Sequence, residues 1–133
     1  MRKSLLYFTL AALILLAVIA LNACSPSKSD EPAQAVTAYW QALVAQDSAR
    51  LSSLSCAAYE AEAQNTLESF KSVAVKLNDL ACSTTSTSGD SAAVHCTGTI
   101  VASYGAENLT INLADRDYAA VKEGGEWLMC GAK

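Results

Sequence analysis

Four cysteines in the C-terminal part of the chain place the strongest constraint on its fold. In a domain outside the cytoplasm, an even number of cysteines predicts disulfides, and four cysteines allow three pairings. Cys82 lies seven residues before Gly89 and Cys96 lies seven residues after it, within a Ser- and Thr-rich segment typical of a turn. A hairpin that turns at Gly89 sets Cys82 opposite Cys96, close enough for a disulfide. By elimination, the second predicted disulfide joins Cys56 to Cys130.

A metal site is the alternative use of these cysteines. Structural zinc sites are usually built from closely spaced cysteines and several histidines. This chain has no Cys-x-x-Cys spacing, and its sole histidine is His95. Thiol redox enzymes also depend on closely spaced cysteines. We therefore predict no bound metal and no cofactor.

The start of the chain has the organisation of an export signal. Arg2 and Lys3 provide a positive start, and the 17 residues 5–21 are uncharged and almost entirely apolar. A basic start, an apolar segment and a small residue before the cleavage point are the parts of a secretory signal peptide. Because the positive flank stays in the cytoplasm, the rest of the chain is expected on the extracytoplasmic side.

Cys24 directly follows this segment. The sequence Leu21-Asn22-Ala23-Cys24 resembles the lipobox of bacterial lipoproteins, although Asn22 departs from the small residue usual at its position. The resemblance implies that Cys24 becomes the first residue of the mature chain and carries several acyl chains, which suffice for a stable membrane anchor. The alternative is an uncleaved helical anchor over residues 5–21, whose length lies at the lower limit for a membrane span.

The chain is thus expected to have three parts. These are a signal over residues 1–23, a lipidated and flexible tether over 24–32, and one folded domain over 33–133. From Cys24 onward there are seven Lys and Arg against 13 Asp and Glu, a net charge of −6. An acidic domain lacks the positive surface that nucleic acid requires, so nucleic-acid binding is excluded as a predicted function.

Helical periodicity dominates the first half of the domain. We expect a first helix over 32–46, a second over 48–54 capped by Asp47, and a third over 57–72. Pro32 suits the first turn of a helix. Apolar residues at helical spacing form the expected buried stripe of the first helix: Val36, Tyr39, Trp40 and Leu43.

Strand-like alternation replaces this period from Val73 onward. The predicted strands cover residues 73–84, 94–104, 109–121 and 126–130. We expect a bend or bulge at Gly98, a bulge at 114–116, and a hairpin turn at Gly124-Gly125. Helices followed by about four antiparallel strands predict an α+β fold.

Two segments carry a resemblance to a known family. Residues 38–47, followed by Leu51 and Leu54, resemble the opening of nuclear transport factor 2-like domains, in which an aromatic helix precedes a short helix. Residues 116–130 resemble the final hairpin of small exported proteins of that superfamily. The resemblance implies a cone, with a curved, mainly antiparallel four-stranded sheet around a helix and often a pocket. The family contains enzymes, ligand-binding proteins and dimers, so the resemblance alone implies no single function.

Few residues in the chain suggest chemistry. His95 lies on the strand face opposite Cys96 and is predicted to be a surface residue, because a general base needs a partner and a pocket. Asp115 and Asp117 flank Arg116 at the expected bulge, which we interpret as a solvated bend. No catalytic residue is predicted.

A cone pocket is the expected place for a ligand. Four aromatic residues are its candidate lining, with core packing as their alternative role: Tyr39, Trp40, Tyr118 and Trp127. We predict a membrane-anchored, non-catalytic domain that binds an envelope protein or a small ligand. The alternatives are an isomerase- or dehydratase-like enzyme that uses the pocket, and a structural homodimer formed through the open face of the sheet.

Overall fold

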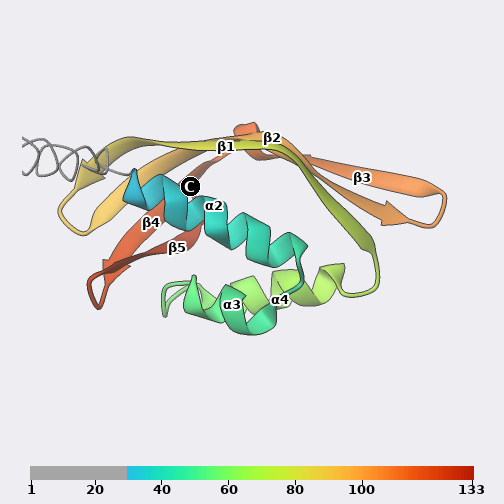
Figure 1. Cartoon of the computed structure of the whole chain (residues 1–133), viewed down its shortest axis with the longest axis horizontal. Coiled ribbons are helices and arrows are strands. Elements are labelled where there is room, and N and C mark those ends of the chain that lie inside the picture. Colours follow the sequence, from blue (N-terminus) through green and yellow to red (C-terminus); the bar gives the residue numbers. More distant parts are fainter. Residues whose placement is uncertain (1–29) are drawn as a thin grey trace, which may run out of the picture.

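A computed structural model describes residues 30–133 (Figure 1). The predicted signal, the lipidation site Cys24 and the tether up to residue 29 lie outside the described residues. Within the described part, no helix combines the length and the apolar character needed to cross a membrane.

In the described part of the chain, three helices precede the sheet: α2 (Glu31–Val44), α3 (Ser48–Ser53) and α4 (Glu60–Phe70). α2 begins one residue earlier than expected, so Glu31 and Pro32 belong to the helix and not to the tether. It ends two residues early because Gln46 adopts a positive φ of 56°, and the Gln46 side chain donates to the carbonyl of Phe70 at 2.8 Å. The predicted cap of α3 is confirmed, since the Asp47 carboxylate accepts from the backbone N–H of Arg50 at 3.0 Å.

The sheet is antiparallel and contains five strands: β1 (Ala74–Ser88), β2 (Ser91–Tyr104), β3 (Glu107–Asn112), β4 (Asp117–Glu123) and β5 (Glu126–Ala132). β1 pairs with one edge of β2 along nearly its whole length. The other edge of β2 pairs with two strands, since its C-terminal half pairs with β3 and its N-terminal half with β4. β5 then pairs with β4.

The predicted bulge at 114–116 is wrong. The segment between β3 and β4 is a short 3-10 helix, η1 (Leu113–Asp115), which separates one expected bent strand into two. Asn112 caps this turn, because its side-chain oxygen accepts from the backbone N–H of Ala114 at 3.2 Å. The predicted fold class is confirmed at the level of helices packed on a curled antiparallel sheet.

Gly98 lies at a very close approach between β2 and β1. Its φ is +112°, and a Cβ atom at this position would lie 2.7 Å from the carbonyl oxygen of Asn78 and 2.8 Å from that of Asp79. The β1–β2 register shifts between Asn78 and Ala81, and Asp79 itself has a positive φ of 53°. The predicted bend at Gly98 and the register shift in β1 are therefore one feature, a close backbone contact that only glycine allows.

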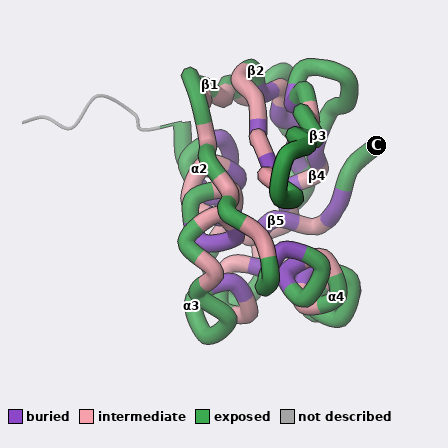
Figure 2. Tube along the Cα trace, turned by 90° about the vertical axis from the view of Figure 1, so that its right-hand side faces the viewer, coloured by how far each residue is buried: buried purple, intermediate pink, exposed green. Residues whose placement is uncertain are grey.

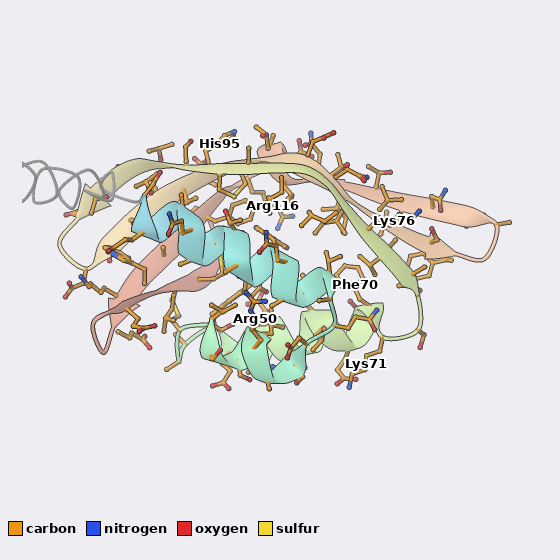
Figure 3. The ribbon with its side chains drawn as sticks, in the orientation of Figure 1. Arg50, Phe70, Lys71, Lys76, His95 and Arg116 are labelled. Carbon is orange, nitrogen blue, oxygen red and sulfur yellow. A yellow bond between two sulfur atoms is a disulfide. The ribbon has the colours of Figure 1, made fainter. Side chains whose placement is uncertain are left out.

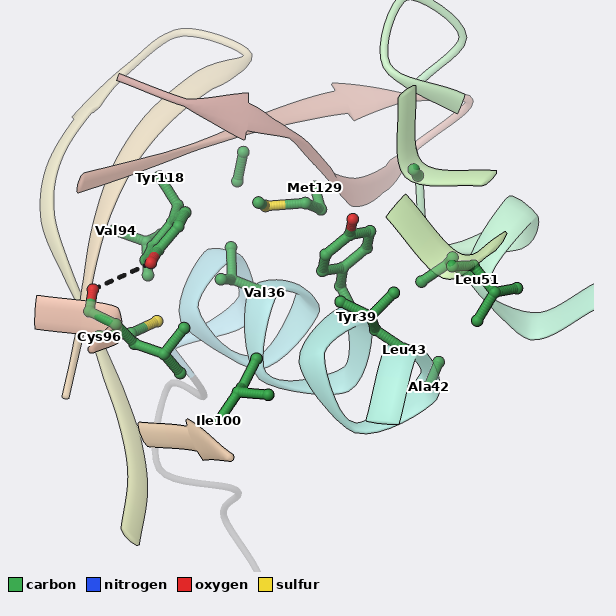
Figure 4. Close-up of a cluster of buried hydrophobic side chains, with 14 of the residues drawn as sticks. Val36, Tyr39, Ala42, Leu43, Leu51, Val94, Cys96, Ile100, Tyr118 and Met129 are labelled. Atoms are coloured by element: carbon green, nitrogen blue, oxygen red, sulfur yellow. Dashed lines mark hydrogen bonds between the residues drawn. The ribbon is translucent and has the colours of Figure 1, made fainter. Parts of the chain in front are cut away.

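The core lies between the helices and the concave side of the sheet (Figures 1 and 2). α2 contacts β1, β2, β4 and β5, so it fills the curved sheet, and α3 and α4 form a further layer below it. Alternate residues of β2 face this helix, as predicted. Figure 4 shows several of the buried residues together: Val36, Tyr39, Leu43, Val94, Cys96, Ile100, Tyr118 and Met129.

The hairpin of β2 and β3 extends beyond this core, to the right in Figure 1. Tyr104 is 46% exposed and Leu109 is 50% exposed. The β2–β3 register pairs Leu109 with the buried Ala102, so the alternation places both side chains on the inner face of the sheet. None of the described helices covers this part of the hairpin in Figure 1, so the two side chains remain in solvent.

Both predicted disulfides are present. Cys82 pairs with Cys96 in the β1–β2 register, with their Cα atoms 4.1 Å apart. The Cys56–Cys130 disulfide joins the α3–α4 connection to β5. Around it, the backbone N–H of Cys56 donates to the carbonyl of Met129 at 2.9 Å, so backbone pairing reinforces the covalent link.

The two disulfides should differ in their contribution to stability. The chain separation is 14 residues for Cys82–Cys96 and 74 for Cys56–Cys130. Loop-closure entropy therefore predicts losses of about 3 kcal/mol for C82A/C96A and about 4.5 kcal/mol for C56A/C130A. Urea unfolding of the oxidised double variants measures both losses. Equal stability of both variants and the parent would contradict the predicted disulfide contribution.

Gly98→Ala should strongly destabilise the domain. The substitution places a methyl group against two backbone carbonyls and forces a non-glycine residue into a rare conformation, at a cost of about 3 kcal/mol or more. Gly105→Ala is the matched control, because Gly105 has a φ of +65° and a methyl group added to it would meet no atom within 4 Å. This control should cost about 1 kcal/mol. Comparable unfolding midpoints for the two variants would show that the Gly98 contact does not shape the sheet.

Candidate functional site

A cavity of about 540 Å³ opens between the helices and the η1 side of the sheet. α2 and α4 supply one wall, and the segment from the end of β3 to the start of β4 supplies the other. The volume lies within the usual range for sites that bind small molecules. The lining residues are Trp40, Tyr59, Glu62, Thr66, Thr110, Ile111, Asn112, Leu113, Asp115, Arg116, Tyr118, Met129 and Ala132.

Aromatic rings form the inner wall of this cavity. The rings of Trp40 and Tyr118 meet edge to face with their centres 5.2 Å apart. Tyr39 packs behind Trp40 at the same separation, and Tyr59 lies 6.0 Å from Tyr39. Edge-to-face packing of this kind stabilises the rings beyond the gain from burial alone, so the wall is held in place before a ligand arrives.

The four predicted lining residues separate into three groups. Trp40 and Tyr118 line the cavity. Tyr39 is fully buried and belongs to the core. Trp127 lies beside a separate, more open depression with Gly125 and Glu126, and the Lys122 ammonium lies 5.8 Å from its ring centre.

Tyr118 connects the cavity wall to the η1 turn. Its hydroxyl donates to the carbonyl of Leu113 at 2.9 Å, and both residues are buried. Asn112 also donates to the Asp115 carboxylate at 3.0 Å. These bonds hold the turn that carries Arg116, whose side chain lies on the inner side of the sheet in Figure 3.

Charged side chains lie only at the exposed rim of the cavity. Glu62, Asp115 and Arg116 are all exposed residues. Burial raises the pKa of the Tyr118 phenol, and the positive charge of Arg116 opposes this rise. Burial and the neighbouring Tyr59 raise the pKa of the Tyr39 phenol, so both inner phenols are neutral at physiological pH.

His95 has a partner that the sequence did not reveal. The β2–β4 register places it directly opposite Asp117, and its Nδ1 lies 2.8 Å from the Asp117 carboxylate. Both side chains are exposed, at 39% and 51%, and neither lines the cavity. Figure 3 places His95 on the outer side of the sheet, as predicted for a surface residue. An exposed pair of this kind lacks the enclosed site that general base catalysis needs.

Tyr59 and Arg116 were not among the predicted lining residues. Tyr59 falls inside the third helix predicted over 57–72, but α4 begins at Glu60 and Tyr59 precedes it. Arg116 was noted only at a solvated bend. Among residues 30–133, no group of three or more His, Cys, Asp or Glu side chains is arranged to hold a metal ion.

Comparison of the chain with known protein families gives no matching family. No curated protein matches it either. The inference about function therefore depends on the geometry of the cavity and on the sequence.

Two Tyr→Phe substitutions should have opposite effects on stability. Tyr118→Phe leaves the buried Leu113 carbonyl without its donor and should cost about 1 kcal/mol. The Tyr39 hydroxyl is buried and has no hydrogen-bond partner among the described residues. Tyr39→Phe should therefore be neutral or stabilise by up to about 1 kcal/mol. Chemical unfolding of both variants checks the contrast, and a larger loss for Tyr39→Phe would contradict it.

Proposed function

We propose that this protein is an exported lipoprotein whose domain binds a small, largely apolar ligand in the aromatic cavity. The observation that carries the proposal is the cavity itself, with an aromatic inner wall and charges only at its rim. Apolar walls with a few polar groups are typical of sites that bind small molecules. Trp40 contributes its ring to this wall, while its indole N–H is buried away from the cavity and has no hydrogen-bond partner within residues 30–133.

The rim charges favour binding over catalysis. An enzyme with a cone pocket needs a titratable group that can reach its substrate inside the pocket. In the described cavity, Glu62 and Asp115 are exposed at the mouth, and the inner phenols of Tyr39 and Tyr118 stay protonated. Binding of a ligand therefore requires only the side chains that line the cavity, whereas catalysis would require a further titratable group inside it.

Membership of the nuclear transport factor 2-like family is part of the same proposal. Three helices precede a curled antiparallel sheet that encloses α2, and a hairpin turning at Gly124-Gly125 ends the chain. This order supports the resemblance noted in residues 38–47 and 116–130. Because members of the family differ in activity, the assignment adds a fold and not a function.

The lipobox-like sequence ending at Cys24 supports the proposed location at a membrane, outside the cytoplasm. Two disulfides in the domain are consistent with an oxidising compartment outside the cytoplasm. α2 begins at Glu31, and Trp40 lies nine residues further along it, or about 14 Å at the rise of an α-helix. The proposed anchor at Cys24 lies only seven residues before the start of this helix, so the short segment between them would keep the cavity near the membrane surface.

The proposed lipid anchor and extracytoplasmic location can be tested by measuring the intact mass of the protein purified from membranes. We expect a chain that starts at Cys24 with three acyl chains and a glycerol, and a gain of four hydrogens on reduction. Cys24→Ala should release an unlipidated chain from its anchor. An unlipidated mass that starts at Met1 would instead show a helical anchor, and free cysteines would place the domain in the cytoplasm.

Ligand binding can be tested through the two tryptophans, since Trp40 lines the cavity and Trp127 does not. Full-length protein in lipid nanodiscs is titrated with 4-phenyl-1-butanol, a neutral aromatic probe. Trp127→Phe, which leaves Trp40 as the emitter, should show a saturable fluorescence change. Trp40→Phe should show none. A response from Trp127 alone, or from neither variant, would refute the proposed cavity.

A further inference from the structure

At the mouth of the cavity, the guanidinium of Arg116 has no partner among the described residues. The close contacts between basic and acidic side chains within residues 30–133 are Lys71–Glu68 and His95–Asp117, and neither includes it. The neighbouring Asp115 carboxylate already accepts a hydrogen bond from Asn112 at 3.0 Å. Arg116 thus keeps its donors available, and a planar guanidinium suits a carboxylate well.

Arg116 is the one cationic side chain in the described lining of the cavity. Trp40 contributes its ring to the wall, but its indole N–H is buried and out of reach of a ligand. The Tyr118 hydroxyl donates to the carbonyl of Leu113. The remaining polar side chains of the lining are Tyr59, Glu62, Thr66, Thr110, Asn112 and Asp115. A ligand with a negative charge at one end and an apolar body therefore finds a partner for its charge in Arg116 and an aromatic wall for its body.

We infer that the ligand is a small carboxylic acid with an aromatic or aliphatic body, bound as its anion. The carboxylate pairs with Arg116, and the apolar body lies against Trp40 and Leu113. A charge-assisted hydrogen bond to a carboxylate is about twice as strong as a neutral one. The inference rests on the proposed binding function and adds the chemical class of the ligand.

A cationic ligand fits this cavity less well. Aromatic sites for cations present open ring faces to the charge, whereas Tyr118 is only 4% exposed and packs against Trp40. Arg116 also repels a second positive charge. Glu62 and Asp115 at the rim act in the opposite direction, since their carboxylates weaken binding of an anion. Neutralising Arg116 and neutralising Glu62 should therefore have opposite effects.

The test compares three probes with the same aromatic body: 4-phenylbutyrate, 4-phenyl-1-butanol and 4-phenylbutylamine. Affinities are measured by fluorescence of Trp40 in full-length Trp127→Phe protein in nanodiscs. We expect the acid to bind about tenfold more tightly than the alcohol, which corresponds to about 1.4 kcal/mol. Arg116→Gln should abolish this preference, and Glu62→Gln should strengthen binding of the acid.

Lys122→Gln is the matched control, because it removes one positive charge beside Trp127 and outside the cavity. It should leave the preference for the acid unchanged. If the alcohol or the amine binds as tightly as the acid, the ligand class is wrong while the binding function stands. Retention of the acid preference in Arg116→Gln would also refute the inferred role of Arg116. If none of the three probes binds, the proposed function fails together with the inference.

Discussion

The close backbone contact at Gly98 is the constraint on which the rest of this structure depends. β1 and β2 are the two longest strands, and a flat pairing of such strands would leave no concave side to enclose a helix. At Gly98 the chain passes too near the carbonyls of Asn78 and Asp79 for any side chain. The β1–β2 register shifts there, and the same strands are joined further along by Cys82–Cys96. α2 then fills the concave side, and the cavity remains where the sheet and helices diverge.

Features set by local pattern could be predicted from the sequence. Equal spacing of Cys82 and Cys96 from Gly89 predicted that these two residues pair, and they do. The turn itself pairs Ser88 with Ser91, and a one-residue register shift between Thr84 and Ser86 brings the cysteines opposite each other. Asp47 was predicted as a helix cap from its position alone. The η1 turn was missed because it depends on the Tyr118 hydroxyl, five residues away from its acceptor. The His95–Asp117 pair and the cavity lining depend on which edge of β2 each strand takes, and alternation carries no such information.

One edge of β2 pairs with β3 along its C-terminal half and with β4 along its N-terminal half. The chemistry of the cavity follows from this arrangement. Where β3 ends and β4 begins, η1 places Arg116 at the inner side of the sheet, next to the aromatic wall formed by Trp40 and Tyr118. The wall is packed and neutral, whereas the charges lie at the rim. Such a site can hold and orient an amphipathic molecule, and the proposed lipid anchor would keep it at a membrane surface. The proposed role as a binding protein of the cell envelope would account for both features.

The most direct test of the proposed site is a crystal structure of the protein with saturating 4-phenylbutyrate. We expect the phenyl ring against Trp40, inside the cavity, with the carboxylate within hydrogen-bond distance of Arg116. An empty cavity, or a ligand seated only beside Trp127, would contradict the proposed site.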